Sequence, residues 1–584
     1  MSQRPTLAAL ALAALAAAGC ASSHANTAPA PAAAPAGATL GPVAWPDESP
    51  IVKLAPRPTT PAITAADLMT RLYRFADDSM QGRESGALGN YKGTDYIAGE
   101  FAKDGLTPMG EHGTFFQTIG LVRGGFDSTL SLTSSAGPIT PWQDIVPLPP
   151  IGQTPFVPQW DGHDVPVVFA GRWGDSTATP AGALDGKVAV FLLPGDGRSL
   201  GFWVVPDPRA AKASAVVVVA PDSLMPLLAE NFDRERESLT REHPAAGPLA
   251  SFVSAGAAAR LLGHPLDGLA PGTAGATLSG SVHYVERPTA YPARNVIALL
   301  KGSDPARNGE YVVVSAHNDH VGMGRVVDHD SLRAFNRVMR PWGANNRVGN
   351  PTPAQWDSIR TLLDSARVRR HGATRADSIF NGADDDGSGT VVLLEIAEDL
   401  AHRATRPARS ILFVSHTGEE KGLLGSQWFT DHPTVPRDSI VAALNMDMLG
   451  KGRKTDMDGS PTSVQLIGSY RLSTDLGKLI DTLNAHRSEH MAIDYTYDAH
   501  GNPLNRYCRS DHFMYARYGI PITYFSLGYA IDYHQQTDEP QYIDYDHGAL
   551  VGRFVRDIAL AVANRPDRLK VDGPIQDPNK PCRQ

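Results

Sequence analysis

The sequence predicts an α/β fold in which a mostly parallel mixed sheet is sandwiched between helices and a β-rich module is inserted. After Arg294, short apolar runs alternate with loops and helix-like segments, a pattern typical of a sheet covered by helices. Between residues 130 and 282 the apolar runs are short, β-branched and bounded by Gly, Pro and Asp, which favours strands with few helices. The 584 residues suffice for two or three domains.

Two helices are expected before the inserted module. Residues 65–76 place Leu68, Leu72 and Phe75 close to helical spacing, and residues 91–103 repeat the pattern. A glycine-rich loop, MQGRESGALGN, separates the two segments.

The C-terminal part is expected to supply most of the sheet. Several of its apolar runs are nearly continuous, as in strands that are buried on both faces. The expected strands are 295–300, 311–315, 411–415, 440–445, 464–467 and 521–526, with a helix at 390–402. An Arg-rich segment at 324–378 interrupts this pattern and is expected to cross the active-site face. An influence on substrate choice and an inert insertion are both open for this segment.

These observations divide the chain into six segments. We expect a signal peptide at 1–20, a disordered tether at 21–60, a first part of the main domain at 61–130, the insert at 131–285, the catalytic part at 286–566 and a C-terminal tail at 567–584.

Composition excludes several classes of protein. The net charge is -9 and no basic run is present, which argues against a nucleic-acid partner. Beyond the N-terminus no run of eighteen apolar residues predicts an internal membrane span. Three cysteines, Cys20, Cys508 and Cys582, are too few for a disulfide scaffold or a cysteine-rich metal site. They leave open a bridge between Cys508 and Cys582.

The N-terminus predicts export. Arg4 precedes an Ala/Leu-rich stretch at 7–18, which is too short to span a bilayer and is typical of a signal peptide. The segment ends in LAAAGC and resembles a bacterial lipoprotein signal, in which Cys20 would carry the lipid. Ala17 departs from the usual Leu, and an ordinary secretory signal is the alternative. Because Ala21 is not Asp, we expect an outer-membrane lipoprotein facing the periplasm, or otherwise a periplasmic or secreted protein. The following Ala/Pro/Ser/Thr-rich residues favour a flexible tether.

Five motifs near the expected strands carry residues that bind metals. Open α/β sheets bind ligands beyond the carboxyl ends of their strands, so motifs far apart in sequence are expected to meet. Zinc accepts imidazole and carboxylate ligands, whereas grouped carboxylates without a cation would repel one another. The motifs are AHNDH at 316–320, GADDDGSG at 382–389, GEEKGLLGS at 418–426, NMDMLG at 445–450 and YHQQTDEP at 533–540.

This set resembles the di-zinc exopeptidase family of bacterial leucyl aminopeptidase. Glutamate carboxypeptidase and the transferrin receptor are relatives that carry a protease-associated (PA) insert. The resemblance covers about 63–565 and implies two zinc ions, a peptide substrate and a PA-like insert that shapes or shields the cleft, with a passive spacer as the alternative. The implied metal ligands are His317 and Asp447 on one ion, Glu420 and His534 on the other, and Asp385 between them.

The resemblance also implies three catalytic roles. Glu419 would be the general base, which takes a proton from water and passes it to the leaving amine. Asp319 would orient His317 and raise its basicity. Tyr507, three residues before Ser510, would stabilise the oxyanion.

Other polar residues near the motifs are expected to have structural roles. Asp384 and Asp386 should cap the helix that follows them rather than bind metal. We leave three histidines outside the ligand set: His320, His416 and His512.

The predicted reaction is hydrolysis of an N-terminal peptide bond by a water that two zinc ions activate. An acidic rim would attract the free amine. A carboxypeptidase or dipeptidase of the same fold is the alternative, with Arg506 or Arg509 as candidates to hold a carboxylate. A single-zinc cyclising enzyme and a catalytically inactive receptor or binding protein are further rivals. The absence of G-x-S-x-G and H-E-x-x-H disfavours a serine hydrolase and a zincin.

Overall fold

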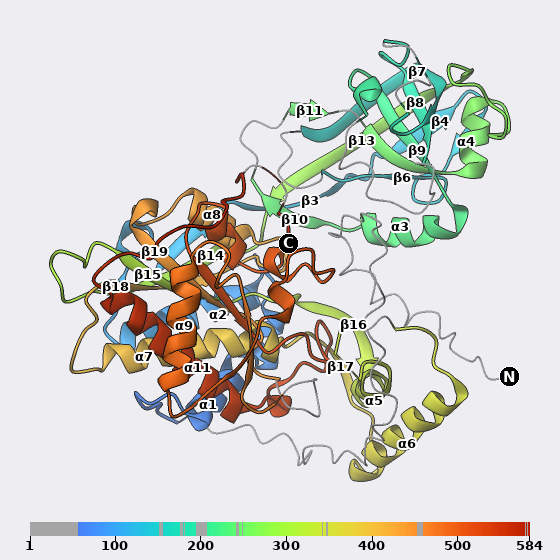
Figure 1. Cartoon of the computed structure of the whole chain (residues 1–584). Coiled ribbons are helices and arrows are strands. Elements are labelled where there is room, and N and C mark those ends of the chain that lie inside the picture. Colours follow the sequence, from blue (N-terminus) through green and yellow to red (C-terminus); the bar gives the residue numbers. More distant parts are fainter. Residues whose placement is uncertain are drawn as a thin grey trace. The chain divides into compact units, whose positions relative to one another are not determined.

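The computed structural model describes residues 57–150, 156–175, 179, 182–193, 207–240, 245–247, 249–341, 343–345, 348–451, 460–578, 580 and 582–584. These residues form two compact units (Figure 1). Unit 1 combines Thr289–Gln584 with the segment that ends at Ile119, and unit 2 is Gly120–Pro288. The expected signal peptide, Cys20 and most of the tether at 21–60 lie outside the described residues.

Unit 1 is built on a nine-stranded mixed sheet in the order β1-β14-β18-β15-β19-β22-β20-β21, with β2 paired to β14. Its centre is parallel: β15 pairs with β18 and β19, and β19 pairs with β22. The α/β fold class predicted from the alternating pattern is therefore confirmed. The strands are β1 (Thr107–Pro108), β2 (Phe116–Ile119), β14 (Ala293–Leu300), β15 (Tyr311–His317), β18 (Ser410–His416), β19 (Ile440–Met446), β20 (Ser463–Ile467), β21 (Ala492–Asp494) and β22 (Ile522–Ser526).

Helices cover both faces of this sheet (Figure 1). Successive side chains of a strand point to opposite faces, so Val312 and Val314 join one hydrophobic core while Val313 joins the other. This double burial explains the nearly continuous apolar runs. The first core takes residues from α1 (Ala65–Phe75), α2 (Leu88–Lys103), α7 (Gly389–Ala401), α9 (Thr474–His486) and α11 (Tyr545–Asn564), and the second from α8 (Leu424–Asp431) and α10 (His512–Ala516).

The Arg-rich segment forms a folded subdomain within unit 1, which we call the excursion. Its ends pair as an antiparallel ribbon, and Thr352 opens the longer helix with a capping box in which Gln355 is the reciprocal partner. A small core of Ala334, Met339 and Ile359 joins the two helices. The elements are β16 (Met323–Asp328), α5 (His329–Met339), α6 (Pro353–Arg369) and β17 (Ala376–Ile379).

Unit 2 is a second mixed sheet, in the order β10-β3-β13-β7-β8-β9-β12-β6 with β4, β5 and β11 beside it, and it carries two short helices. Its strands are β3 (Leu121–Phe126), β4 (Ser131–Ser134), β5 (Gly137–Ile139), β6 (Ile145–Pro147), β7 (Phe156–Arg172), β8 (Val188–Leu192), β9 (Ala215–Ala220), β10 (Arg236–Leu239), β11 (Ala245–Gly247), β12 (Leu249–Ser254) and β13 (Ala274–Pro288), and its helices are α3 (Met225–Phe232) and α4 (Ala255–Leu262).

Unit 2 begins earlier than the boundary expected at residue 131. Strand β2 pairs in the sheet of unit 1, and β3 begins at Leu121 and pairs with β10 and β13 of unit 2. One residue, Gly120, therefore separates the strands of the two units. The identity of unit 2 as a PA-like insert stays a prediction.

The C-terminal residues Cys582 and Gln584 are bound to unit 1 by a disulfide and a hydrogen bond. Cys508 and Cys582 form a disulfide, with their Cα atoms 5.6 Å apart, which settles the pairing that the sequence left open. The Gln584 side chain accepts a hydrogen bond from the Tyr507 backbone N–H at 2.8 Å. Within the described ranges, the helices are all too short or too polar to cross a bilayer.

Candidate metal centre

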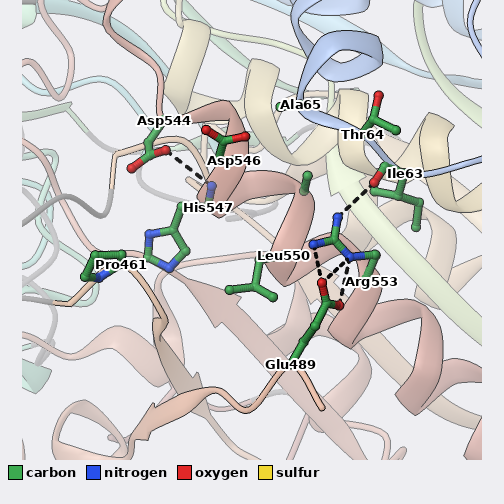
Figure 2. A pocket seen from close by; sticks show the side chains of 11 residues that line it. Ile63, Thr64, Ala65, Pro461, Glu489, Asp544, Asp546, His547, Leu550 and Arg553 are labelled. Carbon is green, nitrogen blue, oxygen red and sulfur yellow. Dashed lines mark hydrogen bonds and ion pairs between the residues drawn. The ribbon is translucent and has the colours of Figure 1, made fainter. Parts of the chain in front are cut away.

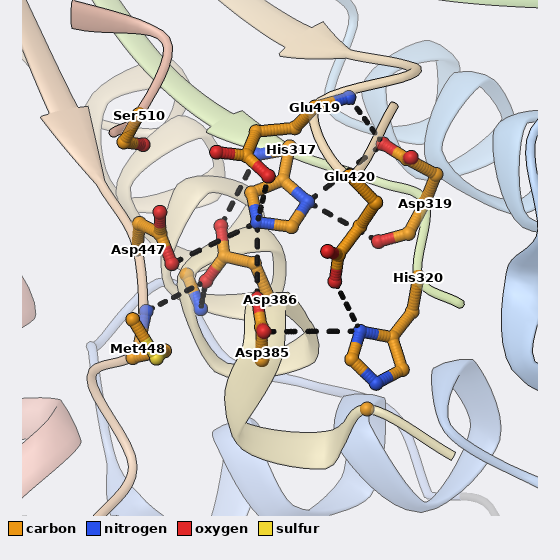
Figure 3. A network of polar contacts seen from close by, with 12 residues as sticks. His317, Asp319, His320, Asp385, Asp386, Glu419, Glu420, Asp447, Met448 and Ser510 are labelled. Atoms are coloured by element: carbon orange, nitrogen blue, oxygen red, sulfur yellow. Dashed lines mark hydrogen bonds and ion pairs between the residues drawn. The ribbon is translucent and has the colours of Figure 1, made fainter. Parts of the chain in front are cut away.

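The sequence-predicted ligands gather at the carboxyl ends of the parallel strands, and Figure 3 shows all of them except His534. His317 is the last residue of β15, and Asp447 directly follows β19. Glu420 lies in the loop after β18 and His534 in the loop after β22, while Asp385 precedes α7. Strand direction thus delivers side chains from five distant segments to one place.

Two ligand groups share one carboxylate. The first ligand group is His317, Asp385 and Asp447, and the second adds His320, Glu420 and His534 to Asp385; within each group the donor atoms lie within 4.8 Å of one another. Asp385 turns Oδ1 towards His317 Nε2 at 3.2 Å and Oδ2 towards His534 Nε2 at 3.0 Å. This is the geometry expected of a carboxylate that bridges two cations.

Unsatisfied buried atoms show that the groups suit a cation. His317 Nε2, His534 Nε2 and Asp447 Oδ1 are buried and, among the residues that the structure describes, lie close to oppositely charged groups without the geometry of a hydrogen bond. Buried polar atoms are normally hydrogen-bonded, and imidazole nitrogens and carboxylate oxygens are preferred zinc donors. The donor set therefore fits zinc.

Imidazole–carboxylate pairs set the pKa values of the centre. Burial alone would raise the pKa of Asp385, but the imidazoles of His317 and His534 hold it well below its usual range. Burial would lower the pKa of His534, yet Glu420 and Asp385 raise it to about 10. Because imidazole binds metal in its neutral form, cation binding would release these protons.

Glu419 belongs to neither ligand group but faces the first. Its Oε2 lies 3.9 Å from His317 Nε2, and burial raises its pKa well above the usual range. Its backbone N–H donates to Asp319 Oδ1 at 3.1 Å. A carboxylate beside the donors and outside both groups is available for proton transfer.

Asp319 supports two neighbours at once. His317 Nδ1 lies 3.1 Å from the backbone carbonyl oxygen of Asp319 and 3.7 Å from its carboxylate. The carboxylate itself accepts from the Glu419 N–H and from Ser85 Oγ, the latter at 2.9 Å. Asp319 therefore lies behind His317, as expected, and in addition fixes the turn that carries Glu419.

The two aspartates beside Asp385 bind backbone. Asp386 accepts hydrogen bonds from the N–H groups of His317, Gly389 and Met448 at 3.1, 2.9 and 3.1 Å. Gly389 begins α7, so Asp386 caps that helix as expected. The expectation that Asp384 also caps this helix is wrong: its carboxylate accepts instead from Gly450 N–H at 2.7 Å, in the turn after β19. These aspartates bind peptide groups and leave Asp385 free for the donor groups.

The three histidines left outside the ligand set differ in position. His320 Nδ1 lies 2.6 Å from Glu420 Oε1, and His320 belongs to the second ligand group, closer to the centre than the sequence indicated. His416 Nε2 lies 2.9 Å from the Tyr515 hydroxyl. The ring of His512 stacks on that of Tyr524, with centroids 4.6 Å apart.

Tyr507 packs behind the centre. Its ring lies under the guanidinium of Arg471 at 4.2 Å and near the ring of His512, and burial raises its pKa to about 12. Among the described residues, Tyr507 contacts no member of either ligand group, so its oxyanion role stays a prediction.

The two candidate carboxylate-binding arginines also differ. Arg506 is buried and donates to Gln465 Oε1 at 2.8 Å. Arg509 Nη2 lies 3.4 Å from the Tyr533 hydroxyl, and its guanidinium lies over the ring of Tyr529 at 4.6 Å. The guanidinium of Arg506 also lies over the ring of Tyr529, at 4.1 Å, so both arginines contact the loop that carries His534.

Several supporting residues were missed by the sequence analysis. Asp538 accepts from the N–H groups of Asp384 and Asp385 at 3.0–3.1 Å, and it pairs with Lys451 Nζ at 2.6 Å. Buried Arg83 donates to the carbonyls of Asn381 and Gly382 at 2.6 and 2.8 Å, which fixes the turn before Asp385. Arg83 lies in a glycine-rich loop and Asp538 in a polar motif, so neither carried a signal of burial.

A hollow of about 470 Å³ lies elsewhere on unit 1, beside the first turns of α1 and α11 (Figure 2). Several of its polar groups are paired with one another: Arg553 binds Glu489 at 2.6 Å and the carbonyl of Ile63 at 2.9 Å, and Asp544 accepts from His547 N–H at 3.3 Å. Its lining residues belong to neither ligand group, and we assign it no ligand.

Comparison with known proteins finds a family likeness within the C-terminal half of the chain. Residues 295–559 match the profile of peptidase family M28. Leucine aminopeptidase 1 of Sclerotinia sclerotiorum is 33% identical over 175 residues, covering 28% of this chain and 43% of the relative. Leucine aminopeptidase 1 of Fusarium vanettenii is 33% identical over 239 residues, covering 37% and 58%. A probable zinc metalloprotease of Pyricularia oryzae is 25% identical over 245 residues, covering 35% and 47%. The chain thus spans about half the length of these relatives.

Two solved structures share low sequence identity with this chain. An aminopeptidase from Aneurinibacillus sp. strain AM-1 is 16% identical with a TM-score of 0.46, covering 88% of this chain and 96% of its own. A zinc aminopeptidase from Bacillus subtilis is 17% identical with a TM-score of 0.45, covering 89% and 100%.

Proposed function

We propose that this chain is a zinc-dependent exopeptidase of family M28 that removes the N-terminal residue of a peptide. The observation that carries the proposal is Asp385, whose two oxygens face two separate donor groups beside Glu419. The family match over residues 295–559 and the relatives named leucine aminopeptidase and zinc metalloprotease support it. The complete donor set disfavours a receptor without catalytic activity.

Two zinc ions at this centre would lower the pKa of a water and polarise the scissile carbonyl. The proposed ligands are His317 and Asp447 for one ion, Glu420 and His534 for the other, and Asp385 for both. His320 would hold Glu420 through the contact between its Nδ1 and Oε1.

Proton transfer is the task of Glu419. Its carboxylate would accept a proton from the attacking water and return it to the leaving amine. The Glu419 backbone N–H donates a hydrogen bond to the Asp319 carboxylate. This bond would hold Glu419 in position while it takes the proton from water and then passes it to the amine. The surrounding carboxylates would attract the ammonium group of the substrate, which favours N-terminal cleavage.

Matched peptides test this specificity. We expect the zinc-loaded protein to shorten a free-amine peptide stepwise from its N-terminus and to spare the N-acetylated form of the same peptide. Sequencing the products over time measures the direction of cleavage. Shortening from the C-terminus would assign a carboxypeptidase instead, and an intact free-amine peptide would favour a binding protein.

We also propose that the protein is exported and anchored by a lipid on Cys20. The composition of residues 1–20 supports this, as does the Cys508–Cys582 bridge, because disulfides persist in oxidising compartments. Cells that express the full chain and are fed labelled palmitate should yield a labelled protein, and Cys20→Ala should abolish the label. An unlabelled wild-type product would indicate ordinary secretion.

A further inference from the structure

We propose that the excursion sets the zinc affinity of the second ligand group by positioning the loop of His534, with Arg333 as the main positioning residue. The inference rests on the proposed zinc centre. It gives a function to a segment for which substrate selection and inert insertion were both open.

The excursion forms hydrogen bonds with this loop on both sides of His534. Ala344 N–H donates to the carbonyl of Tyr529 at 3.0 Å, and Arg340 Nη1 donates to the carbonyl of Ile531 at 3.3 Å. Beyond His534, Gln536 Nε2 donates to the carbonyl of Arg325 at 3.2 Å. The loop therefore has fixed points before and after the ligand.

Arg333 supplies the buried charge at the start of the loop. Its Nη1 lies 2.8 Å from Asp532 Oδ2, and the two side chains are only 3% and 2% exposed. Its guanidinium also lies 3.3 Å from the centre of the Tyr542 ring, after the loop. Thr537 Oγ1 donates to the other oxygen of Asp532 at 2.5 Å. One arginine thus joins α5 to both ends of the segment that holds His534.

A chain of alternating buried charges continues from Arg333 to the shared carboxylate. Asp532 lies 3.5 Å from Lys451 Nζ, which lies 2.6 Å from Asp538. Asp538 accepts from the N–H of Asp385 at 3.1 Å. Removal of one member of a buried pair leaves the partner uncompensated, so loss of Arg333 acts first on Asp532, two residues before His534.

Two further residues of the excursion, His329 and Arg375, contact Glu539 after His534 in the same segment. His329 Nε2 lies 2.8 Å from Glu539 Oε2, and Arg375 Nη1 donates to the same oxygen at 2.9 Å. Arg375 is more exposed than Arg333, with 18% of its side chain accessible. Its loss should therefore disturb the loop less.

Zinc titration of the full chain against a competing chelator tests the inference. In Arg333→Met we expect one site to keep its wild-type affinity and the other to weaken about 10- to 100-fold, as when outer residues that orient ligands are lost. Arg333→Lys should recover part of the affinity because it restores the charge. Arg360→Met is the matched control, because Arg360 lies on α6 of the same excursion in an exposed pair with Asp357; both sites should remain unchanged.

Wild-type affinity at both sites in a folded Arg333→Met protein would overturn the inference, as would an equal loss of affinity at both sites. Circular dichroism and thermal melting establish that each variant is folded. If Arg333→Met does not fold, Arg375→Met must show the same one-site loss to a smaller degree, and two unchanged sites there would refute the proposal. Zinc titration requires no peptide, so this outcome is separate from that of the cleavage experiment.

Discussion

Glu419→Gln is expected to lower kcat about 10²- to 10⁴-fold while zinc content stays at the wild-type level. The amide keeps the size of the carboxylate but cannot accept a proton, and general-base catalysis contributes on this order. Glu419 belongs to neither ligand group, so metal retention should not depend on it. The hydrogen bond to Asp319 comes from the backbone of residue 419 and survives the substitution.

Two measurements check this prediction: steady-state hydrolysis of a free-amine peptide, and metal analysis of the dialysed protein. Glu230→Gln is a suitable control because Glu230 is exposed in unit 2, far from α7 in sequence. Wild-type kcat in Glu419→Gln would remove Glu419 as the base. Loss of zinc in the same variant would make it a ligand instead.

Asp385→Ala is expected to lose both high-affinity zinc sites together. Asp385 is the only residue that the two ligand groups share among the described residues, and its substitution removes one donor from each. The substitution also removes one negative charge from the centre, so the remaining carboxylates would attract each cation less strongly. Metal analysis after dialysis should therefore fall from two ions per chain to fewer than one, with activity lost in parallel.

Asp364→Ala serves as the comparison, since Asp364 lies exposed on α6. Asp385→Ala should remain folded by circular dichroism, because the N–H groups around it are bound by Asp386 and Asp538. Retention of two tightly bound ions in this variant would contradict the bridging role. Selective loss of a single ion would place Asp385 in one ligand group only.

The strands of the unit 1 sheet could be predicted from the sequence because strands that are buried on both faces appear as nearly continuous apolar runs. The runs at 311–315 and 411–415 lie inside β15 and β18, each of which extends to a histidine. The meeting of His317, Asp385 and His534 also followed from sequence, since loops after parallel strands share one edge. Their roles as ligands stay predictions until metal is measured.

The supporting charges could not be predicted in the same way. Lys451 and Asp538 are 87 residues apart and each lies among polar neighbours, so local composition gives no reason to bury them. Arg83 likewise lies in a loop of small residues, although it binds carbonyls about three hundred residues away. Pairing at such range depends on the tertiary fold, which periodicity does not encode.

The hydrogen bonds to Asp386 hold together the three backbone segments that carry proposed ligands. One carboxylate gathers peptide groups from the end of β15, the start of α7 and the turn after β19, and these are the segments that bear His317, Asp385 and Asp447. The backbone segments that carry these three side chains are thus held together by hydrogen bonds to one carboxylate. An incoming cation would displace protons rather than reorganise loops, and little of its binding free energy would be lost to ordering the chain.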